Sequence, residues 1–189
     1  MKQAKVLADK ELKRALSICE AMQNSKRNRI MLLLSHYAGL RVGEIASLKW
    51  ADILDRNSMP KAMFYLKAEN TKAKEARQVH LNAKLKKELA GYWAQLDKWK
   101  NPQRAVIESQ KGGAFTSNSM VQAFGRIYAA AGIDDASSHS GRRWFITKLA
   151  HAGISPKVIM ELAGHKQLTT TQRYIDVTDQ QKANAVEVL

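Results

Sequence analysis

Two basic side chains, His139 and Arg142, lie three residues apart in the segment HSGRR, which is typical of the beginning of a helix. Residues at this spacing share one face of a helix, and the N-terminus of a helix attracts anions. A guanidinium donates paired hydrogen bonds to phosphate oxygens, and an imidazole exchanges protons near neutral pH. The pair is therefore a candidate phosphate site, with a capping histidine and a solvated arginine as the alternative.

Arg41 begins a second predicted helix and has Glu44 one turn after it. The spacing permits an arginine that is directed at an anion and held in place by the carboxylate. It equally permits a weak local ion pair on the surface, the more common role of such charges.

Three kinds of residue could supply protons or a nucleophile. Lys72 and Lys74 lie in a predicted turn, TKAKEAR, from which an ammonium group can act as a general acid. His165 and Tyr174 are nine residues apart near the C-terminus. A tyrosine becomes nucleophilic when cations such as Arg173 stabilise its phenolate. Solvated lysines and a packed tyrosine are the ordinary alternatives.

Other chemistries lack the residues they need. The sequence has no HExxH motif, no cluster of carboxylates and no His/Cys set, so we expect no metal site. It has no glycine-rich phosphate loop either, which argues against a nucleotide cofactor. Three further histidines, His36, His80 and His151, are assigned to structural roles.

A mostly helical fold must position these candidates. Apolar residues at 12, 15, 16 and 19 follow helical spacing after Asp9, and further helices are predicted at 27–38, 42–48, 82–99, 119–131, 141–151, 156–163 and 179–188. Strand-like segments at 63–66 and 78–81, joined by a turn at 68–76, predict one small antiparallel sheet. Residues 100–115 follow no regular pattern. The expected fold class is mainly α with a small antiparallel sheet.

Length and charge restrict the class of protein. The chain has 189 residues, which predicts one domain over 1–189 with an adequate core. It carries 31 Lys and Arg against 17 Asp and Glu, a net charge of +14 that attracts polyanions, nucleic acid foremost. The alternative is a merely well-solvated basic surface. One cysteine, Cys19, excludes an internal disulfide. No apolar leader or membrane span is present, and we expect a cytoplasmic, nucleoid-associated protein.

Four segments, taken together and in order, resemble the catalytic domain of the tyrosine recombinases, the phage integrase family. They are AGLRVGEIASLKWADI, TKAKEARQVHL, HSGRR and LAGHKQLTTTQRY, and the resemblance covers residues 7–177. It implies the fold of that domain and assigns the catalytic positions to Arg41, Lys72 (or Lys74), His139, Arg142, His165 and the nucleophile Tyr174, with Glu44 in support.

The resemblance also implies a reaction: duplex DNA is cut and rejoined through a 3′-phosphotyrosyl intermediate, with no metal or other cofactor. Arg41 and Arg142 would stabilise the charge of the transition state, and Lys72 would protonate the leaving 5′-oxygen. His139 would assist proton transfer from the tyrosine, and His165 would donate a hydrogen bond to the phosphate. The implied outcome is DNA integration, excision or inversion by copies that assemble on DNA and are monomeric when free.

Several features differ from the family pattern or leave alternatives open. Gly141 and Arg143 replace the leucine and second histidine of the motif His-x-Leu-Arg-His, which is expected to loosen the start of the helix. The N-terminal core-binding domain of the family is expected to be absent, as in an excised domain or a short recombinase. After Tyr174, an apolar face at 183, 186 and 189 either docks on a neighbouring copy or packs in cis.

Two other functions remain in competition with recombination. A nicking-closing enzyme like the type IB topoisomerases uses a similar set of arginine, lysine, histidine and tyrosine. A DNA-binding regulator could keep the fold without the reaction.

Overall fold

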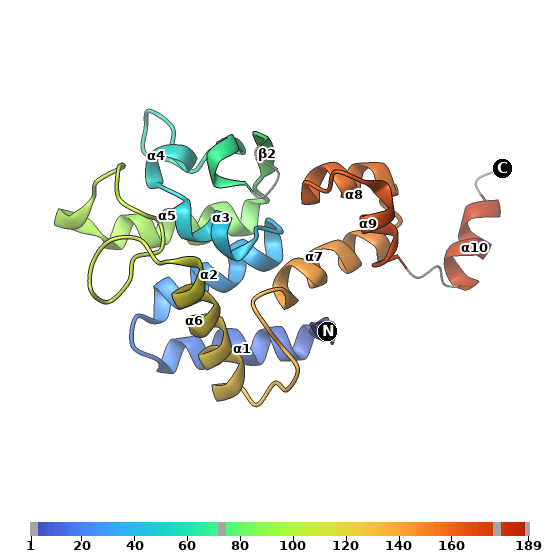
Figure 1. The fold of residues 1–189 in the computed structure, drawn as a ribbon, viewed down its shortest axis with the longest axis horizontal. Helices are drawn as coiled ribbons and strands as arrows, with labels where there is room; N and C mark the ends of the chain where they lie inside the picture. The colour runs from blue at the N-terminus through green and yellow to red at the C-terminus, as the bar shows by residue number, and fades with distance from the viewer. Residues whose placement is uncertain (1–3, 72–74, 176–178, 188–189) are drawn as a thin grey trace.

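The computed structural model describes residues 4–71, 75–175 and 179–187 (Figure 1). Its helices are α1 (Asp9–Ala21), α2 (Ser25–Tyr37), α3 (Val42–Ser47), α4 (Trp50–Ile53), α5 (Ala83–Gln95), α6 (Ser117–Ala130), α7 (Ser140–His151), α8 (Pro156–Ala163), α9 (Leu168–Gln172) and α10 (Asp179–Val186). Two strands, β1 (Met63–Leu66) and β2 (Arg77–His80), and two 3-10 helices, η1 (Ala68–Asn70) and η2 (Asp97–Trp99), complete the described elements. The expected fold class, mainly α with a small antiparallel sheet, is confirmed.

Helix α2 forms the centre of the core. Every residue from Ile30 to His36 is buried, because α1, α5 and α7 pack around this helix (Figure 1). A second, smaller cluster joins α7 to α8 through Ile146, Ala150, Ile159 and Ala163, and Tyr174 packs against it. The segment that carries the candidate nucleophile is therefore attached to the core through α7 and α8.

The two strands pair antiparallel, as predicted, with Met63 opposite His80 and Leu66 opposite Arg77. Phe64, Leu66 and Val79 are buried, whereas Tyr65 is exposed. This alternation fits a sheet with one face on the core. The turn that joins the strands contains Lys72 and Lys74, which lie outside the described residues.

Most predicted helices are confirmed, and the differences lie at their ends and in short segments. Helix α1 begins at Asp9 with Ala8 as its N-cap, where the Glu11 carboxylate accepts the Ala8 N–H at 2.8 Å. Helix α6 begins two residues earlier than predicted, because the Thr116 hydroxyl accepts the Ser119 N–H. The short helices α4 and α9 were not predicted.

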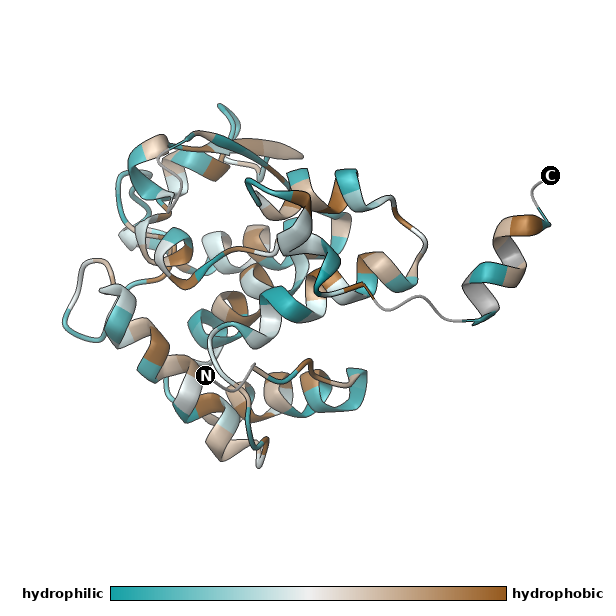
Figure 2. Cartoon of the chain, turned by 45° about the vertical axis from the view of Figure 1, so that its right-hand side comes forward, coloured by the Kyte–Doolittle hydropathy of each residue, from teal (hydrophilic) through white to brown (hydrophobic). Residues whose placement is uncertain are grey.

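Helix α10 stands apart from the rest of the domain (Figures 1 and 2). All of its residues whose burial is described are exposed, and the apolar Val186 is 63% exposed. In the part of the chain that the structure describes, no helix is long and apolar enough to cross a membrane.

Candidate active site

Three arginines converge on the C-terminal end of α8. Each donates a hydrogen bond to a different one of three successive backbone carbonyls: Arg77 to Leu162 at 2.9 Å, Arg142 to Ala163, and Arg41 to Gly164 at 3.0 Å. The carbonyls at this end of a helix carry partial negative charge, so guanidinium groups are stabilised there. The end of α8 thus joins α3, β2 and α7 at one point.

Glu44 is the anion inside this cluster and is only 1% exposed. Its carboxylate accepts from the Arg41 backbone N–H at 2.8 Å and from the Arg41 guanidinium at 2.9 Å. The guanidinium of Arg77 donates two further hydrogen bonds, at 2.7 and 3.2 Å. Burial alone raises the pKa of Glu44, but the hydrogen bonds and charges of the two arginines outweigh burial, and the pKa lies below its ordinary value. Glu44 is therefore ionised and fixes both arginines.

Arg142 is 6% exposed and has no carboxylate within ion-pair distance among the described residues. Its Nη1 donates to the Gly39 carbonyl at 2.6 Å. Burial, followed by the positive charge of Arg41, lowers the pKa of Arg142. A buried cation held by carbonyl oxygens is favourably placed to receive an anionic ligand, because the anion would supply the missing opposite charge.

His165 and Tyr174 lie next to each other beyond α8. Their rings are stacked, with centroids 6.1 Å apart and an interplanar angle of 21°. The guanidinium carbon of Arg143 lies 5.1 Å from the centre of the Tyr174 ring. Burial, and then the charges of Arg142, Arg41 and Arg77, lowers the pKa of His165 to about 4. At neutral pH the His165 ring is therefore uncharged.

The structure brings five of the predicted site residues into one cluster: Arg41, Glu44, Arg142, His165 and Tyr174. His139 lies at the N-cap of α7, on the same helix as Arg142, and its side chain is exposed. Lys72 and its fallback Lys74 fall outside the described residues. The cluster offers cations, a neutral imidazole and a phenol, a set suited to holding a phosphate and attacking it.

Sequence reasoning missed Arg77. This residue has the same strand parity as the buried Val79, and its side chain is 9% exposed. An arginine on the core side of a strand needs a buried partner, so the parity was the available signal. The partners themselves, Glu44 and the Leu162 carbonyl, are distant in sequence.

Gly141 brings α7 close to α2. A Cβ at this position would lie 2.4 Å from Ser35 Oγ and 2.7 Å from His36 Nδ1. Ser140, Gly141 and Arg142 are all buried. The expectation that this glycine loosens the start of the helix is therefore wrong, because its lack of a side chain permits a close contact.

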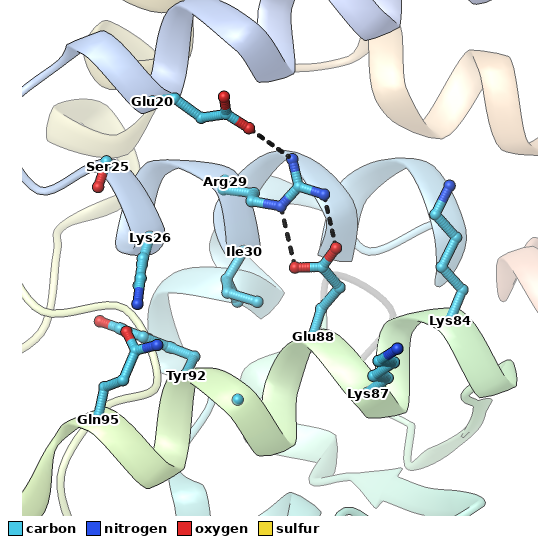
Figure 3. A pocket seen from close by; sticks show the side chains of 11 residues that line it. Glu20, Ser25, Lys26, Arg29, Ile30, Lys84, Lys87, Glu88, Tyr92 and Gln95 are labelled. Carbon is cyan, nitrogen blue, oxygen red and sulfur yellow. Dashed lines mark hydrogen bonds and ion pairs between the residues drawn. The ribbon is translucent and has the colours of Figure 1, made fainter.

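A cavity of about 670 Å³ lies between α2 and α5 (Figure 3). Charged side chains surround it, and Arg29 forms an ion pair with Glu88 at 2.6 Å. None of the candidate site residues lines this cavity. It is therefore separate from the arginine cluster.

The fold and the site together are those of a mainly helical domain that gathers arginines, a histidine and a tyrosine around the end of one helix. The chain belongs to the phage integrase family, whose sequence model matches residues 5–181. It is 32% identical over 167 residues to a tyrosine recombinase of Thermosipho africanus, covering 88% of this chain and 56% of that protein. It is 29% identical to the tyrosine recombinase XerA of Thermococcus kodakarensis, covering 98% of this chain and 64% of the relative.

Solved structures share the fold. A crystal structure of XerA recombinase superposes with a TM-score of 0.78 at 21% identity, covering 98% of this chain and 65% of that one. XerH site-specific recombinase bound to its difH substrate gives a TM-score of 0.72 at 23% identity, covering 99% of this chain and 55% of that one. The chain thus spans between half and two thirds of these proteins.

Proposed function

We propose that this chain is the catalytic domain of a site-specific DNA recombinase, which cuts and rejoins strands through a 3′-phosphotyrosyl intermediate. The observation that carries the proposal is the convergence of Arg41, Arg142, His165 and Tyr174 at the end of α8, in a chain of the phage integrase family. Residues 1–189 form one such domain in this proposal.

Tyr174 is the proposed nucleophile. Its phenolic oxygen attacks a DNA phosphorus, a new phosphotyrosyl bond forms, and the bond to the 5′-oxygen breaks. The number of phosphoester bonds is conserved, so the step consumes no high-energy cofactor. A 5′-hydroxyl from another strand reverses the attack and completes the exchange. The stacked His165 and the nearby Arg143 stabilise the position of the phenol.

Arg41 and Arg142 are proposed to stabilise the pentavalent transition state. Each guanidinium has five N–H donors. The described side-chain contacts use one N–H of Nη1 and one of Nη2 in each arginine. Arg41 donates to Glu44 and Gly164, and Arg142 donates to Gly39 and Ala163. The remaining donors are left for nonbridging phosphate oxygens. Because the protein contacts already fix both side chains, little reorganisation is required during the reaction.

Three residues are proposed to manage protons and the remaining hydrogen bond. His165 is neutral, so it serves as a hydrogen-bond donor to the phosphate. His139, exposed at the start of α7, assists proton transfer from Tyr174. Lys72, with Lys74 as the fallback, protonates the leaving 5′-oxygen.

Duplex DNA is the proposed partner. The net charge of +14 favours a polyanion, and related structures include XerH on difH and a lambda integrase dimer on a core site. We further propose that the protein is monomeric when free and that copies associate on DNA, with α10 of one copy docking on the next. The exposed apolar Val186 supports docking in trans over packing in cis.

Covalent trapping tests the proposed reaction. The full chain is incubated in EDTA with a labelled pool of nicked duplexes of random sequence, beside Tyr174→Phe and the control Tyr65→Phe, which changes an exposed tyrosine of β1. We expect a protein–DNA adduct on denaturing gels with the wild type and the control, and none with Tyr174→Phe. An adduct that persists in Tyr174→Phe would rule out this nucleophile.

The same samples separate the alternatives. Relaxation of supercoiled plasmid without strand exchange would indicate a nicking-closing enzyme. DNA binding without any adduct in the wild type would indicate a regulator.

A further inference from the structure

Thr171 is a fully buried residue of α9 whose hydroxyl contacts the candidate site. Its side chain has 0% exposure, and Oγ1 lies 2.8 Å from Nδ1 of His165. Its backbone carbonyl accepts the N–H of Tyr174 at 3.0 Å. One buried residue therefore contacts both the imidazole and the segment that carries the phenol.

The direction of the hydrogen bond follows from what each group can do. A buried hydroxyl must donate its proton, because an unsatisfied polar group in the interior costs about 1–3 kcal/mol. Among the described residues, His165 Nδ1 is the one hydrogen-bond partner of the Thr171 hydroxyl. The hydroxyl therefore donates, and Nδ1 accepts.

We infer that Thr171 is a positioning residue that holds His165 in the tautomer with its proton on Nε2. A neutral imidazole carries one N–H, so an accepting Nδ1 places that proton on the other nitrogen. Nε2 has no hydrogen-bond partner among the described residues, which leaves it available to donate to a phosphate oxygen. This role rests on the proposed function, because the phosphate is the substrate named there.

The surrounding charges make the tautomer important. A protonated imidazole would donate from both nitrogens, whereas burial, together with the positive charges of Arg142, Arg41 and Arg77, lowers the pKa of His165 and keeps its ring neutral at physiological pH. Without Thr171, the neutral ring could move its proton to Nδ1 and present an acceptor to an anion. The repulsion between that lone pair and a phosphate oxygen would oppose the transition state.

Nitrogen NMR tests the tautomer without any reaction. The full chain is labelled with ¹⁵N-histidine, and the His165 signals are assigned by their loss in His165→Gln. We expect Nε2 in the protonated range and Nδ1 in the unprotonated range in the wild type. In Thr171→Val, which removes the hydroxyl at nearly constant volume, both signals should move toward a mixture of tautomers. Thr171→Ser should restore the wild-type pattern.

The control is Thr169→Val, which changes an exposed threonine on the same helix and should leave the His165 signals unchanged. A protonated Nδ1 in the wild type would overturn the inference. So would an unchanged tautomer in a folded Thr171→Val. If that variant fails to fold, Thr171→Ser and the wild type still decide, because the inference requires the same Nε2–H tautomer in both.

The rate at which the protein cleaves the nicked duplex and forms the covalent adduct gives the second readout. Loss of the group that orients His165 should slow single-turnover cleavage at saturating DNA by about 10- to 100-fold, the loss typical when the hydrogen-bond partner of a metal-bound histidine is removed. DNA affinity should not change, and Thr171→Ser should recover most of the rate. Equal rates in Thr171→Val and the wild type would contradict the proposed role. If the wild type forms no adduct, the proposed function fails, while the NMR result still decides the tautomer.

Discussion

At the scale of single residues, one buried carboxylate serves two arginines that have different roles. Glu44 binds Arg41, which we propose contacts the phosphate, and Arg77, which also donates to the Leu162 carbonyl. Arg77 is not proposed to contact the phosphate, yet it ties the strand next to the Lys72 turn to the end of α8. Its contribution should therefore appear first in stability.

We predict that Arg77→Met lowers the free energy of unfolding by about 3 kcal/mol, because removing one partner of a buried ion pair leaves the other charge poorly compensated. Urea denaturation followed by circular dichroism measures the change. Arg56→Met is the control, since Arg56 is exposed in a turn and should change stability by less than about 0.5 kcal/mol. Equal stabilities of the two variants would show that Arg77 does not hold the cluster together.

At the scale of elements, the contact between α2 and α7 determines where Arg142 lies. Gly141, next to Arg142, faces Ser35 and His36 of α2 with no room for a side chain. The buried His36 also lies 5.7 Å, between ring centroids, from Trp144 of α7. The position of the candidate arginine thus depends on the tight packing of two helices.

We predict that Gly141→Ala destabilises the domain by about 1–3 kcal/mol, because the new methyl group forces α7 away from α2. It should also slow adduct formation, since Arg142 moves with the helix. Gly125→Ala is the matched control, because Gly125 is an exposed glycine of α6 and a Cβ added there would meet no atom within 4 Å. Alanine at this position should stabilise the helix, and with it the domain, by about 0.5–1 kcal/mol. Thermal unfolding of both variants decides, and a Gly141→Ala protein as stable as the control would refute the close-packing argument.

The same contact predicts a dependence of stability on pH. Burial lowers the pKa of His36 from 6.5 to about 4, so the folded state resists a proton that the unfolded state accepts. The contribution of His36 to the free energy of unfolding is therefore fully present above pH 6.5. It decreases by about 3 kcal/mol as the pH falls from 6.5 to 4. Urea denaturation across this range should give a shallower loss in His36→Gln, and parallel curves would contradict the prediction.

The sequence predicted the longer helices and the two strands. Helix α1 follows from its apolar spacing and α2 from an apolar run that ends at Gly39, whereas α4 and α9, of four and five residues, are too short to show a helical period. Motif resemblance found Arg41 and Tyr174 of the candidate site. It could not find Thr171 or the partners of Arg77, because these roles depend on burial and on contacts between distant segments.

At the scale of the whole molecule, the protein consists of a basic body, formed by the elements from α1 to α9, and a terminal helix, α10, that stands apart from it. The body holds the arginine cluster, and the charge of +14 favours its approach to DNA. The terminal helix α10 has exposed residues and stands away from the body (Figure 1). Such a helix contributes little to the fold of its own chain and is free to bind another.

We predict that deleting residues 179–189 leaves the free energy of unfolding within about 0.5 kcal/mol of the wild type, because the described residues of α10 are exposed. The truncated protein should still form the Tyr174 adduct but should lose assembly of two copies on a duplex with two binding sites, measured by sedimentation. Val186→Asp should reproduce the loss of assembly, whereas Lys182→Ala, which removes only an exposed pair with Asp179, should not. A large loss of stability on truncation would instead mean that α10 packs in cis in solution, and the proposed docking between copies would then be wrong.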